Sequence, residues 1–469
     1  MTTRSPLPSM NPTRTKIVAT LGPATASVES IRKVIDAGAS VLRLNTAHGS
    51  SDELDTMMDR IDLVREQTRP IAVLVDLAGP KIRLGELPDA MVECHEGDVF
   101  GFVPFAKRDE YPELQQPGSK LLTSNYAQLT DDLQLNDSIL LADGTVCMMV
   151  CDKSDEIVRC RVVNSGVIRS RQGINLPGVR LSLPGLTERD REFTAWAAKR
   201  DADFVSLSFV RSASDIRELR ALLASLGSTA PIVAKIEKPE ALDNLVDIVT
   251  ASDAIMVARG DLGVEIDVAE VPVKQKMIIE TCNRLQRPVI VATQMLDSME
   301  EEPRPTRAEA SDVANAILDG ADACMLSGES AIGKYPIEAV SMMRRIMLST
   351  ERLLEKRQPR PPAEIANTVA HPITQSVVFG AARIAEYIGA KCVVVATQSG
   401  NTALAKSSQR DFTPAIVVSP SESVLRRMCL LWGVTPLAGV QLHPPITMRE
   451  FVIQWGKQTG LLADGDPVV

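Results

Sequence analysis

The sequence predicts an α/β fold: a (β/α)8 TIM barrel with an inserted small β-barrel lid domain and a C-terminal α/β domain. Three observations predict this fold. Eight short apolar runs indicate strands, most neighbouring runs are separated by about 23 to 35 residues with a helical pattern, and one interval is longer by roughly 100 residues. Strands that alternate with helices pair in parallel, and eight such units close into a barrel.

The predicted barrel strands follow one another with polar residues at their carboxyl ends. In chain order they are TKIVATLG from Thr15, VLRLN from Val41, IAVLVD from Ile71, FVSLSF from Phe204, PIVAKIE from Pro231, AIMVARGD from Ala254, PVIVATQ from Pro288 and ACMLSGE from Ala323. Their ends carry Asn45, Asp76, Ser208, Lys235, Glu237, Asp261, Thr293, Ser327 and Glu329. The alternative is that these are ordinary polar loop residues. Since barrel active sites lie at this rim, the set indicates a site for an anion and a divalent cation.

The long interval between the third and fourth strands indicates a domain inserted at the catalytic rim. Its runs MVECHEGDVFGFV, SILLADGTVCMMV and EIVRCRVVNSGVI are short and interrupted by turn pairs such as Asp-Gly, which predicts a small antiparallel β-barrel. Pro80 and Pro184 stand near the junctions and suit hinges, so the insert is a candidate lid over substrate. We place the first part of the barrel at 1–79, the lid at 80–180 and the second part of the barrel at 181–354.

The last part of the chain is predicted to be a third domain, over 355–469. It opens with EKRQPRPPAE at 355–364, a stretch rich in proline and charge that indicates a linker. Helical patterns then alternate with the short apolar runs CVVVAT and AIVVS. This alternation predicts an α/β domain.

Composition narrows the class of protein. The net charge of −9 opposes binding to DNA or an anionic membrane, and the 3% aromatic content argues against stacking platforms for single-stranded nucleic acid. The eight cysteines form no paired CxxC motif, which indicates reduced thiols in the cytoplasm. The first residues contain no apolar signal segment, and no apolar run reaches 18 residues. We expect a cytoplasmic protein with no nucleic-acid or membrane partner.

From about Thr15 onward the sequence resembles the pyruvate kinase family. The resemblance rests on ordered segments: TKIVATLGPATAS, VLRLNTAHG, GINLPG, IVAKIEKPEA, IMVARGDLGVEI, VIVATQML and LSGESAIGKYP. It implies the same three-domain fold and the transfer of phosphate from phosphoenolpyruvate to ADP in the last step of glycolysis. It also implies a homotetramer.

The chemistry of the strand ends agrees with phosphoryl transfer, which requires charge neutralisation and positioning. Glu237 and Asp261 offer hard oxygen ligands for Mg²⁺ or Mn²⁺. Lys235 precedes Glu237 by two residues, so both side chains lie on one side of the strand, and its ammonium can act on the phosphoryl group. Arg43 and Arg83 supply further positive charge, the latter to the nucleotide; surface salt bridges are the alternative for both.

Further site residues follow from the resemblance. Gly260 and Asp261 are expected to begin a short helix whose free N–H groups receive the substrate carboxylate. Thr293 is expected near the enolate, where it positions the proton relay. His48 is a candidate nucleotide contact or a structural histidine. In the lid, Arg171 and Gln172 replace two adjacent family lysines, so Arg171 is the remaining cation for the nucleotide.

The sequence departs from the family at the monovalent-cation site. Family members that require K⁺ hold it with Asn, Ser, Asp and Thr oxygens and carry a Glu after the third strand. The corresponding residues here are Asn45, Ala47, Asp76 and Leu77, and the Glu position is occupied by Lys81. Two oxygen ligands are lost and a fixed positive charge is gained, so we expect activity that does not require K⁺. The alternative is a surface lysine on a tolerant loop.

An effector site is expected in the third domain. The segment TQSGNTA lies between a predicted strand and helix, where backbone N–H groups and side chains suit a phosphate. The residues are Thr397, Ser399, Gly400, Asn401 and Thr402, and a plain helix cap is the alternative. Because the sequence ends at GDPVV, before the family's glycine-rich loop and last strand, we expect weak effector binding.

Two other functions remain open from the sequence. One is a metal-dependent aldolase or lyase that acts on phosphoenolpyruvate or pyruvate, since such barrels share a Lys-x-Glu metal site. The inserted domain and the third domain argue against it. The other is a non-catalytic relative, which would have lost a catalytic residue. Arg43, Lys235, Glu237, Asp261 and Thr293 are all present.

Overall fold

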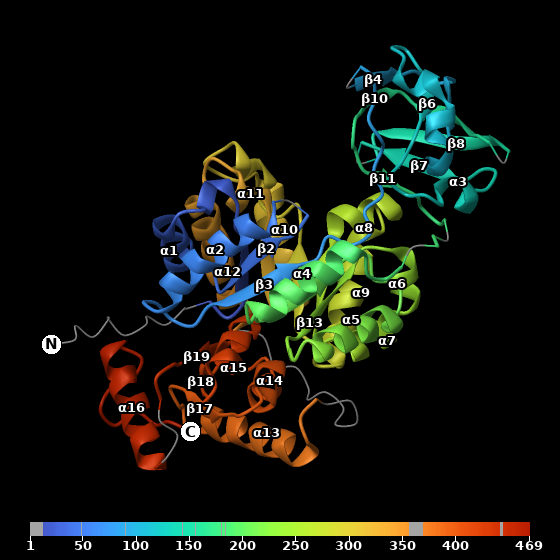
Figure 1. Cartoon of the computed structure of the whole chain (residues 1–469). Helices are drawn as coiled ribbons and strands as arrows, with labels where there is room; N and C mark the ends of the chain where they lie inside the picture. The colour runs from blue at the N-terminus through green and yellow to red at the C-terminus, as the bar shows by residue number, and fades with distance from the viewer. Residues whose placement is uncertain are drawn as a thin grey trace.

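The computed structural model describes residues 13–355, 369–440 and 444–469, except His48, Ala90, Asp143, Asp155, Arg180 and Leu183. The molecule has three parts (Figure 1). A barrel occupies the centre, the lid stands apart from it at the upper right, and the C-terminal domain lies below. This arrangement separates the two ends of the barrel, because the lid adjoins one end and the C-terminal domain the other.

The barrel consists of eight strands. They are β1 (Lys16–Thr20), β2 (Val41–Asn45), β3 (Ala72–Asp76), β12 (Phe204–Leu207), β13 (Ile232–Ile236), β14 (Ala254–Ala258), β15 (Val289–Ala292) and β16 (Ala323–Leu326). All neighbours pair in parallel, in the closed order β1-β16-β15-β14-β13-β12-β3-β2. Each run that predicted a strand forms one, and the predicted fold class is confirmed.

Helices surround the barrel. They are α1 (Val28–Ala37), α2 (Ser51–Arg65), α4 (Glu188–Lys199), α5 (Ala213–Ser225), α6 (Pro239–Asp243), α7 (Leu245–Ala251), α8 (Arg259–Glu265), α9 (Val271–Arg284), α10 (Arg307–Asp319), α11 (Gly328–Ala331) and α12 (Pro336–Leu354), with 3-10 turns at Pro23–Thr25 and Asp297–Glu300. Capping boxes such as Ser50 with Glu53 and Thr306 with Glu309 define where several begin. None of the helices in the described ranges is long and apolar enough to cross a membrane.

Two apolar layers hold the barrel together. Side chains inside the ring, such as Val18, Leu74 and Met256, form one cluster with Cys429 and Leu430 of the C-terminal domain. A much larger cluster lies between the strands and the surrounding helices, with Ile17 and Val291 among its members. Both faces of each strand are therefore buried, which explains why the strands are continuous apolar runs without alternation.

The inserted lid is built from strands. They are β4 (Met91–Cys94), β5 (Val99–Phe102), β6 (Leu121–Leu122), β7 (Ser138–Leu141), β8 (Val146–Lys153), β9 (Val158–Asn164), β10 (Gly166–Arg169) and β11 (Ile174–Asn175), with α3 (Leu129–Asp132) and 3-10 turns at Phe105–Glu110 and Pro112–Gln115. They form a six-stranded sheet, β11-β7-β8-β9-β5-β6, and a pair, β10-β4, around one core. The pairs are antiparallel except β5 with β6.

The C-terminal domain is an α/β layer. Its elements are α13 (Pro372–Tyr387), β17 (Val393–Ala396), α14 (Asn401–Ser408), β18 (Ala415–Val418), α15 (Glu422–Arg427), a 3-10 turn at Met428–Leu430, β19 (Val434–Pro436) and α16 (Pro445–Gln458). The three strands pair in parallel in the order β17-β18-β19. The sequence pattern did not indicate β19, because it has three residues and contains a proline.

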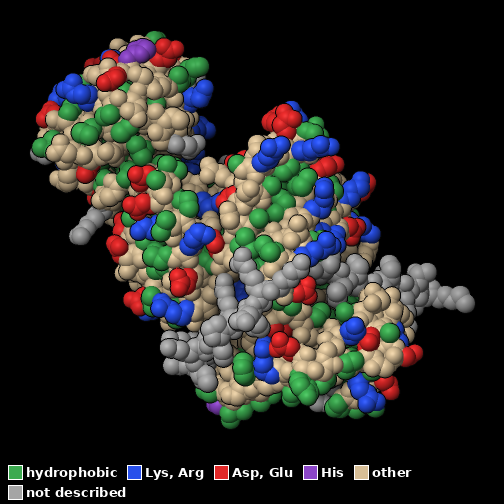
Figure 2. Space-filling model, turned by 180° about the vertical axis from the view of Figure 1, so that it is seen from behind, with side chains coloured by type: hydrophobic (Ala, Val, Ile, Leu, Met, Phe, Trp, Pro, Cys, Tyr) green, Lys and Arg blue, Asp and Glu red, His purple; other side chains and the backbone are tan. Residues whose placement is uncertain are grey.

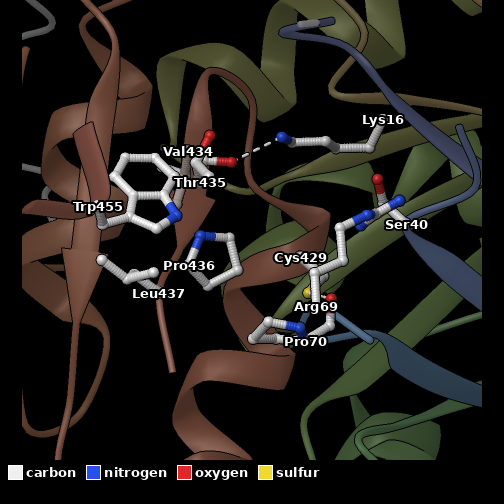
Figure 3. A pocket seen from close by; sticks show the side chains of 10 residues that line it. All are labelled: Lys16, Ser40, Arg69, Pro70, Cys429, Val434, Thr435, Pro436, Leu437 and Trp455. Atoms are coloured by element: carbon white, nitrogen blue, oxygen red, sulfur yellow. Dashed lines mark hydrogen bonds between the residues drawn. The ribbon is translucent and has the colours of Figure 1, made fainter. Parts of the chain in front are cut away.

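The barrel meets the C-terminal domain through buried polar contacts. Lys16, the first residue of β1, donates from Nζ to the carbonyl oxygen of Val434 at 2.7 Å. Figure 3 shows this side chain spanning the junction toward β19, with Arg69 and Cys429 nearby. The cavity around it measures about 20 Å³, enough for about one water molecule. The Lys16 side chain therefore links the barrel to the C-terminal domain through a buried hydrogen bond.

Candidate active site

Asp76 is the centre of a buried charge network at the carboxyl ends of the strands. It ends β3, and Arg43 of β2 donates to its Oδ2 from Nε at 2.8 Å. The Lys235 ammonium lies 3.7 Å from the same oxygen. Ser206 donates to the other oxygen, Oδ1, at 2.5 Å. Burial alone would raise the pKa of Asp76, but the charges of Lys235 and Arg43 outweigh burial and lower this pKa, so the carboxylate is ionised at neutral pH.

Lys235 lies between two carboxylates at the end of β13. Its Nζ is 2.8 Å from Glu237 Oε1 and donates to Ser208 Oγ at 2.9 Å. Burial acts to lower the pKa of Lys235, whereas Asp76, Glu237 and Asp261 raise it, and the net shift is upward. The lysine is therefore a permanent cation. As predicted, the two-residue spacing brings Lys235 and Glu237 to the same side of the strand.

Glu237 is the buried acid of this site. Its Oε2 accepts a hydrogen bond from the backbone N–H of Phe209 at 2.8 Å, which fixes the orientation of the carboxylate. Burial raises the pKa of Glu237; the Lys235 ammonium opposes this shift and the nearby Asp261 carboxylate adds to it. A divalent cation between two neighbouring carboxylates would neutralise their repulsion.

Gly260, Asp261 and Thr293 adjoin the network. Helix α8 begins at Arg259, one residue before the predicted Gly-Asp start, and the Gly260 N–H donates to Thr293 Oγ1 at 2.7 Å. Thr293 has φ of 64°, a left-handed conformation that is costly for a β-branched residue. The next residue, Gln294, has φ of 52°. Such strain persists only where the surroundings hold it.

Arg259 holds this strained segment, and its role was not predicted from the sequence. One guanidinium nitrogen, Nη2, donates to the carbonyl oxygens of Thr293 at 2.6 Å and Gln294 at 2.9 Å. The other, Nη1, donates to Asp312 Oδ2 at 2.5 Å. The only sequence signal for Arg259 was its position directly before Gly260, in the segment IMVARGDLGVEI.

Two further hydroxyl groups of the network were also not predicted. Thr20, at the end of β1, accepts from Arg43 Nη1 at 3.0 Å, and Ser206 orients Asp76. Ser206 pairs with Asp76 in the register of β12 with β3. Contacts between strands depend on register, which the sequence does not give. The only sequence signal for these hydroxyl groups was the alternation of Ser206 with Ser208 in FVSLSF.

The predicted nucleotide residues lie elsewhere. Arg83 and Arg171 are together in the lid, where Arg83 Nη1 donates to the Arg171 carbonyl at 3.2 Å and Arg171 forms an exposed ion pair with Glu86. Figure 2 shows the lid as a separate lobe joined to the barrel by a narrow neck. His48 lies outside the described residues.

Asn45 and Asp76 of the predicted monovalent-cation site pair in the register of β2 with β3, and Lys81 lies at the hinge of the lid. Asn45 Oδ1 accepts a hydrogen bond from the backbone N–H of Ala47 at 3.0 Å, and Asp76 is engaged by Arg43. Leu77 is fully buried. Lys81 is exposed and lines a small cavity at the hinge of the lid; within the described residues its side chain makes no hydrogen bond or ion pair.

Two other predicted groups form local structure. Glu329 is buried and accepts backbone hydrogen bonds from Leu296 at 3.0 Å and Ser327 at 2.7 Å, so it joins two loops at the rim. In the C-terminal domain, the loop before α14 turns at Gly400, with φ of 93°, and Thr397 Oγ1 accepts from the Gly400 N–H at 2.9 Å. Ser399 and Asn401 are exposed there, and Thr402 is half-buried.

The residues of the rim suit a divalent cation that is shared with substrate. In the described part of the chain no three His, Cys, Asp or Glu residues gather into a metal cluster. The Asp261 carboxylate makes no hydrogen bond or ion pair with any described residue, and it is close enough to Glu237 to raise the pKa of that acid. Two hard carboxylates fit Mg²⁺ or Mn²⁺ and leave its other positions to substrate and water.

Comparison with known proteins identifies the family. The model of the pyruvate kinase barrel domain matches residues 12–340, and that of the pyruvate kinase alpha/beta domain matches residues 375–469. The chain is 40% identical over 459 residues to proteins named pyruvate kinase from Staphylococcus aureus strains USA300 and NCTC 8325 / PS 47. Each alignment covers 97% of this chain and 77% of the relative.

Two domain matches in the expected order, and relatives that align along nearly the whole chain, leave one conclusion. This chain belongs to the pyruvate kinase family, whose members are phosphotransferases that convert phosphoenolpyruvate and ADP to pyruvate and ATP.

Proposed function

We propose that this protein transfers the phosphoryl group of phosphoenolpyruvate to ADP in the last step of glycolysis, with Mg²⁺ and without a requirement for K⁺. The observation that carries the proposal is the position of Lys235, a permanent cation held between Asp76 and Glu237 at the barrel rim. A positive charge fixed in advance stabilises the negative charge that moves in phosphoryl transfer.

In this proposal the phosphoryl group is bound by Arg43 and Lys235. Both side chains are anchored from behind by Asp76, so their orientation requires no reorganisation when the reaction occurs. Glu237 and Asp261 would hold the divalent cation. When bound, the cation neutralises phosphate oxygens and orients the substrate.

The rest of phosphoenolpyruvate is assigned to the start of α8 and the end of β15. The substrate carboxylate is placed at the N–H groups of Gly260 and Asp261, where the helix start favours an anion. The Gly260 N–H donates to Thr293 Oγ1, and a bound substrate carboxylate would take the place of this acceptor. Thr293 would position the water that protonates the enolate, because a threonine hydroxyl is itself a poor acid.

The nucleotide is assigned to the space between the lid and the barrel. Arg83 and Arg171 are on the lid, and Arg171 forms only an exposed ion pair with Glu86, which a phosphate can replace at little cost. His48 is proposed as a further nucleotide contact. The lid must therefore move toward the rim when the nucleotide binds.

Independence from K⁺ is proposed from the residues around Asp76. Ala47 and Leu77 offer no side-chain oxygen, and Asn45 Oδ1 already accepts a hydrogen bond from the backbone N–H of Ala47. Lys81 would supply the missing positive charge after lid closure. At about 5 Å and an effective dielectric near 20, one such charge is worth about 3 kcal/mol, or roughly two decades in rate.

A homotetramer is proposed from apolar side chains on the outer face of the C-terminal domain. Ile373, Val377 and Ile384 are 69%, 64% and 56% exposed at helical spacing on α13, and Ile388 follows. A second copy of this chain would cover such a face. The protein is placed in the cytoplasm as a consequence of its glycolytic role, and sedimentation of the Val377→Asp variant against wild type tests the assembly.

An effector site at Thr397, Ser399, Gly400, Asn401 and Thr402 remains a proposal. The Thr397 hydroxyl caps its own turn, so the exposed Ser399 and Asn401 are left as the polar contacts for a phosphate. We expect weak binding of a sugar phosphate or nucleotide, measured by calorimetry with Ser399→Ala as the matched variant.

One assay tests the main proposal. Pyruvate formation from phosphoenolpyruvate is measured with ADP and Mg²⁺ in tetramethylammonium buffer, with and without K⁺. We expect ADP-dependent activity that K⁺ changes less than twofold, and lower activity in Lys81→Glu. Stimulation by K⁺ of tenfold or more contradicts K⁺ independence, whereas absence of ADP-dependent pyruvate contradicts the activity itself.

A further inference from the structure

The carboxylate of Glu265 joins the lid to the barrel. Glu265 ends α8, and its side chain is only 2% exposed. Lys238 Nζ lies 2.6 Å from Oε1, and Asn175 Nδ2 donates to the same oxygen at 3.2 Å. Asn175 ends β11, the last strand of the lid, which lies at the part of the lid nearest α8 in Figure 1. One oxygen atom therefore connects the lid, helix α8 and the loop after β13.

Both barrel partners lie on elements that carry the proposed metal ligands. Lys238 directly follows Glu237, and α8 carries Asp261 in its first turn. Since α8 has only seven residues, movement of Glu265 at its end moves the whole helix. A displacement of the lid that pulls on Glu265 is thus transmitted to both carboxylates.

Phe209 strengthens the link to Glu237. The Lys238 ammonium is 5.8 Å from the centre of the Phe209 ring, and the Phe209 N–H donates to Glu237 Oε2. Phe209 has φ of 57°, so its backbone is held in a left-handed conformation at this point. Lys238 therefore contacts the residue that orients the metal-ligating carboxylate.

The hinge around this contact is charged and encloses a small cavity. Lys81, Arg211 and Lys238 line a cavity of about 30 Å³ together with lid residues Ile174 and Asn175. This volume holds about two water molecules. Among the residues that surround the three cations, Glu265 provides the neutralising charge for Lys238.

A purely structural ion pair is the plain alternative for Lys238 and Glu265, because a nearly buried pair is costly to break. The hydrogen bond from Asn175 distinguishes a purely structural ion pair from a link between the lid and the barrel. It crosses from the lid to the barrel and adds nothing that the ion pair itself requires. By contrast, the lid contact of Asp132 with Ser182 involves the segment returning from the lid and none of the metal-bearing elements.

We propose that Glu265 is a positioning residue that couples the orientation of the lid to the metal-bearing end of the barrel, so that nucleotide capture beneath the lid and the placement of Glu237 and Asp261 depend on each other. The proposal rests on the function proposed above. Asn175 provides the contact of Glu265 with the lid, and Lys238 provides its contact with the loop after β13.

The test uses the full-length protein and starts from the mildest change, Asn175→Ala, which removes the lid contact and keeps the buried ion pair. Glu265→Gln keeps the shape and an acceptor for Asn175 but removes the charge. Glu270→Gln is the matched control, because Glu270 is exposed and its ion pair with the half-buried Lys274 lies outside the hinge. KM for ADP and for phosphoenolpyruvate are measured separately, and amide hydrogen exchange is followed by mass spectrometry in α8 and in α5.

We expect Asn175→Ala to raise KM for ADP about tenfold, the usual effect of losing a hydrogen bond to a charged group, with KM for phosphoenolpyruvate within twofold. Exchange in α8 should accelerate severalfold while α5 is unchanged, and Lys238→Arg should retain the wild-type ratio of KM values. Equal changes in both KM values, or unchanged exchange in α8, overturn the coupling. An inactive wild-type protein overturns the proposed function instead, and the exchange experiment still decides the coupling.

Discussion

The two ends of the barrel carry similar buried charged residues that have different roles. At the carboxyl ends of the strands, Asp76 binds Arg43 and Lys235. At the amino ends, Asp203 binds Arg65 and Arg426, and Asp322 binds Arg410. Arg410 and Arg426 belong to the C-terminal domain, so these pairs join two domains. The first network leaves its cations facing the rim, whereas the second uses them between domains.

The amino-end acids follow one local rule. Asp203, Asp253 and Asp322 each stand directly before a barrel strand and accept the backbone N–H of the first or second residue of the neighbouring strand, at 2.8 to 2.9 Å. The partners are Val73, Ile232 and Val289. This repeated bond satisfies backbone groups at the open end of the ring and makes these acids structural.

The pKa shifts separate the two ends further. Burial raises the pKa of Asp203 and Asp322 in spite of their arginine partners. At the rim, burial is outweighed by Lys235 and Arg43, and the pKa of Asp76 is lowered. Two cations, Arg43 and Lys235, therefore keep Asp76 ionised at the rim. At the opposite end, burial outweighs the arginine partners of Asp203 and Asp322.

The largest expected contrast is between two buried lysines. Lys235→Met should lower kcat by about 10²–10³, because it removes a preorganised charge from the site, while Mg²⁺ affinity and the fold are nearly unchanged. Lys16→Met, at the opposite end of the barrel and shown in Figure 3, should leave kcat within twofold. Steady-state kinetics and circular dichroism check both. More than a tenth of wild-type turnover in Lys235→Met would refute the assignment of this lysine.

Two isosteric changes of aspartate sharpen the comparison. Asp76→Asn should lower kcat about 100-fold, since Arg43 and Lys235 lose the charge that orients them. Asp203→Asn should instead reduce stability by about 3–5 kcal/mol, the usual cost of breaking a buried pair, with kcat per folded molecule retained. Thermal unfolding and active-site titration distinguish the outcomes. Loss of kcat in both variants would mean that the ends are not functionally separate.

Arg259→Lys tests whether strain at the rim matters to catalysis. A lysine cannot reach both the Thr293 and Gln294 carbonyls in the geometry of the guanidinium, so Thr293 should shift. We expect kcat to fall about ten- to a hundredfold with little change in KM, since small misplacements of reacting groups cost rate. Arg220→Lys, on the surface of the barrel, is the control. An unchanged kcat would assign Arg259 to stability alone.

The smallest effect concerns the pH dependence of stability. Burial lowers the pKa of Lys16 from 10.5 to about 8, so the ammonium form is unfavourable in the folded protein. Between pH 8 and 10.5 the unfolded chain binds more protons at this group, and stability rises with pH by up to about 3 kcal/mol. Urea unfolding at pH 7.5 and 9.5 should show a smaller rise in Lys16→Met than in wild type. Identical rises would show that this lysine titrates normally.

The sequence by itself determined the eight strands, their order and the rim residues. Strand identity comes from local apolar runs, and the spacing of Lys235 and Glu237 places both on one side of β13 without knowledge of any neighbour. The direction of each strand then decides which residues reach the rim. These inferences need only the chain's own periodicity, which is why the barrel and the charged rim were predictable.

Only the tertiary structure decided which rim residues contact one another. The bond from Ser206 to Asp76 depends on the register of two strands far apart in sequence, and the left-handed backbone of Thr293 depends on Arg259 from a neighbouring strand end. The link from Asn175 to Glu265 depends on how the lid returns to the barrel. Such contacts arise from packing between distant segments, and local sequence patterns do not encode them.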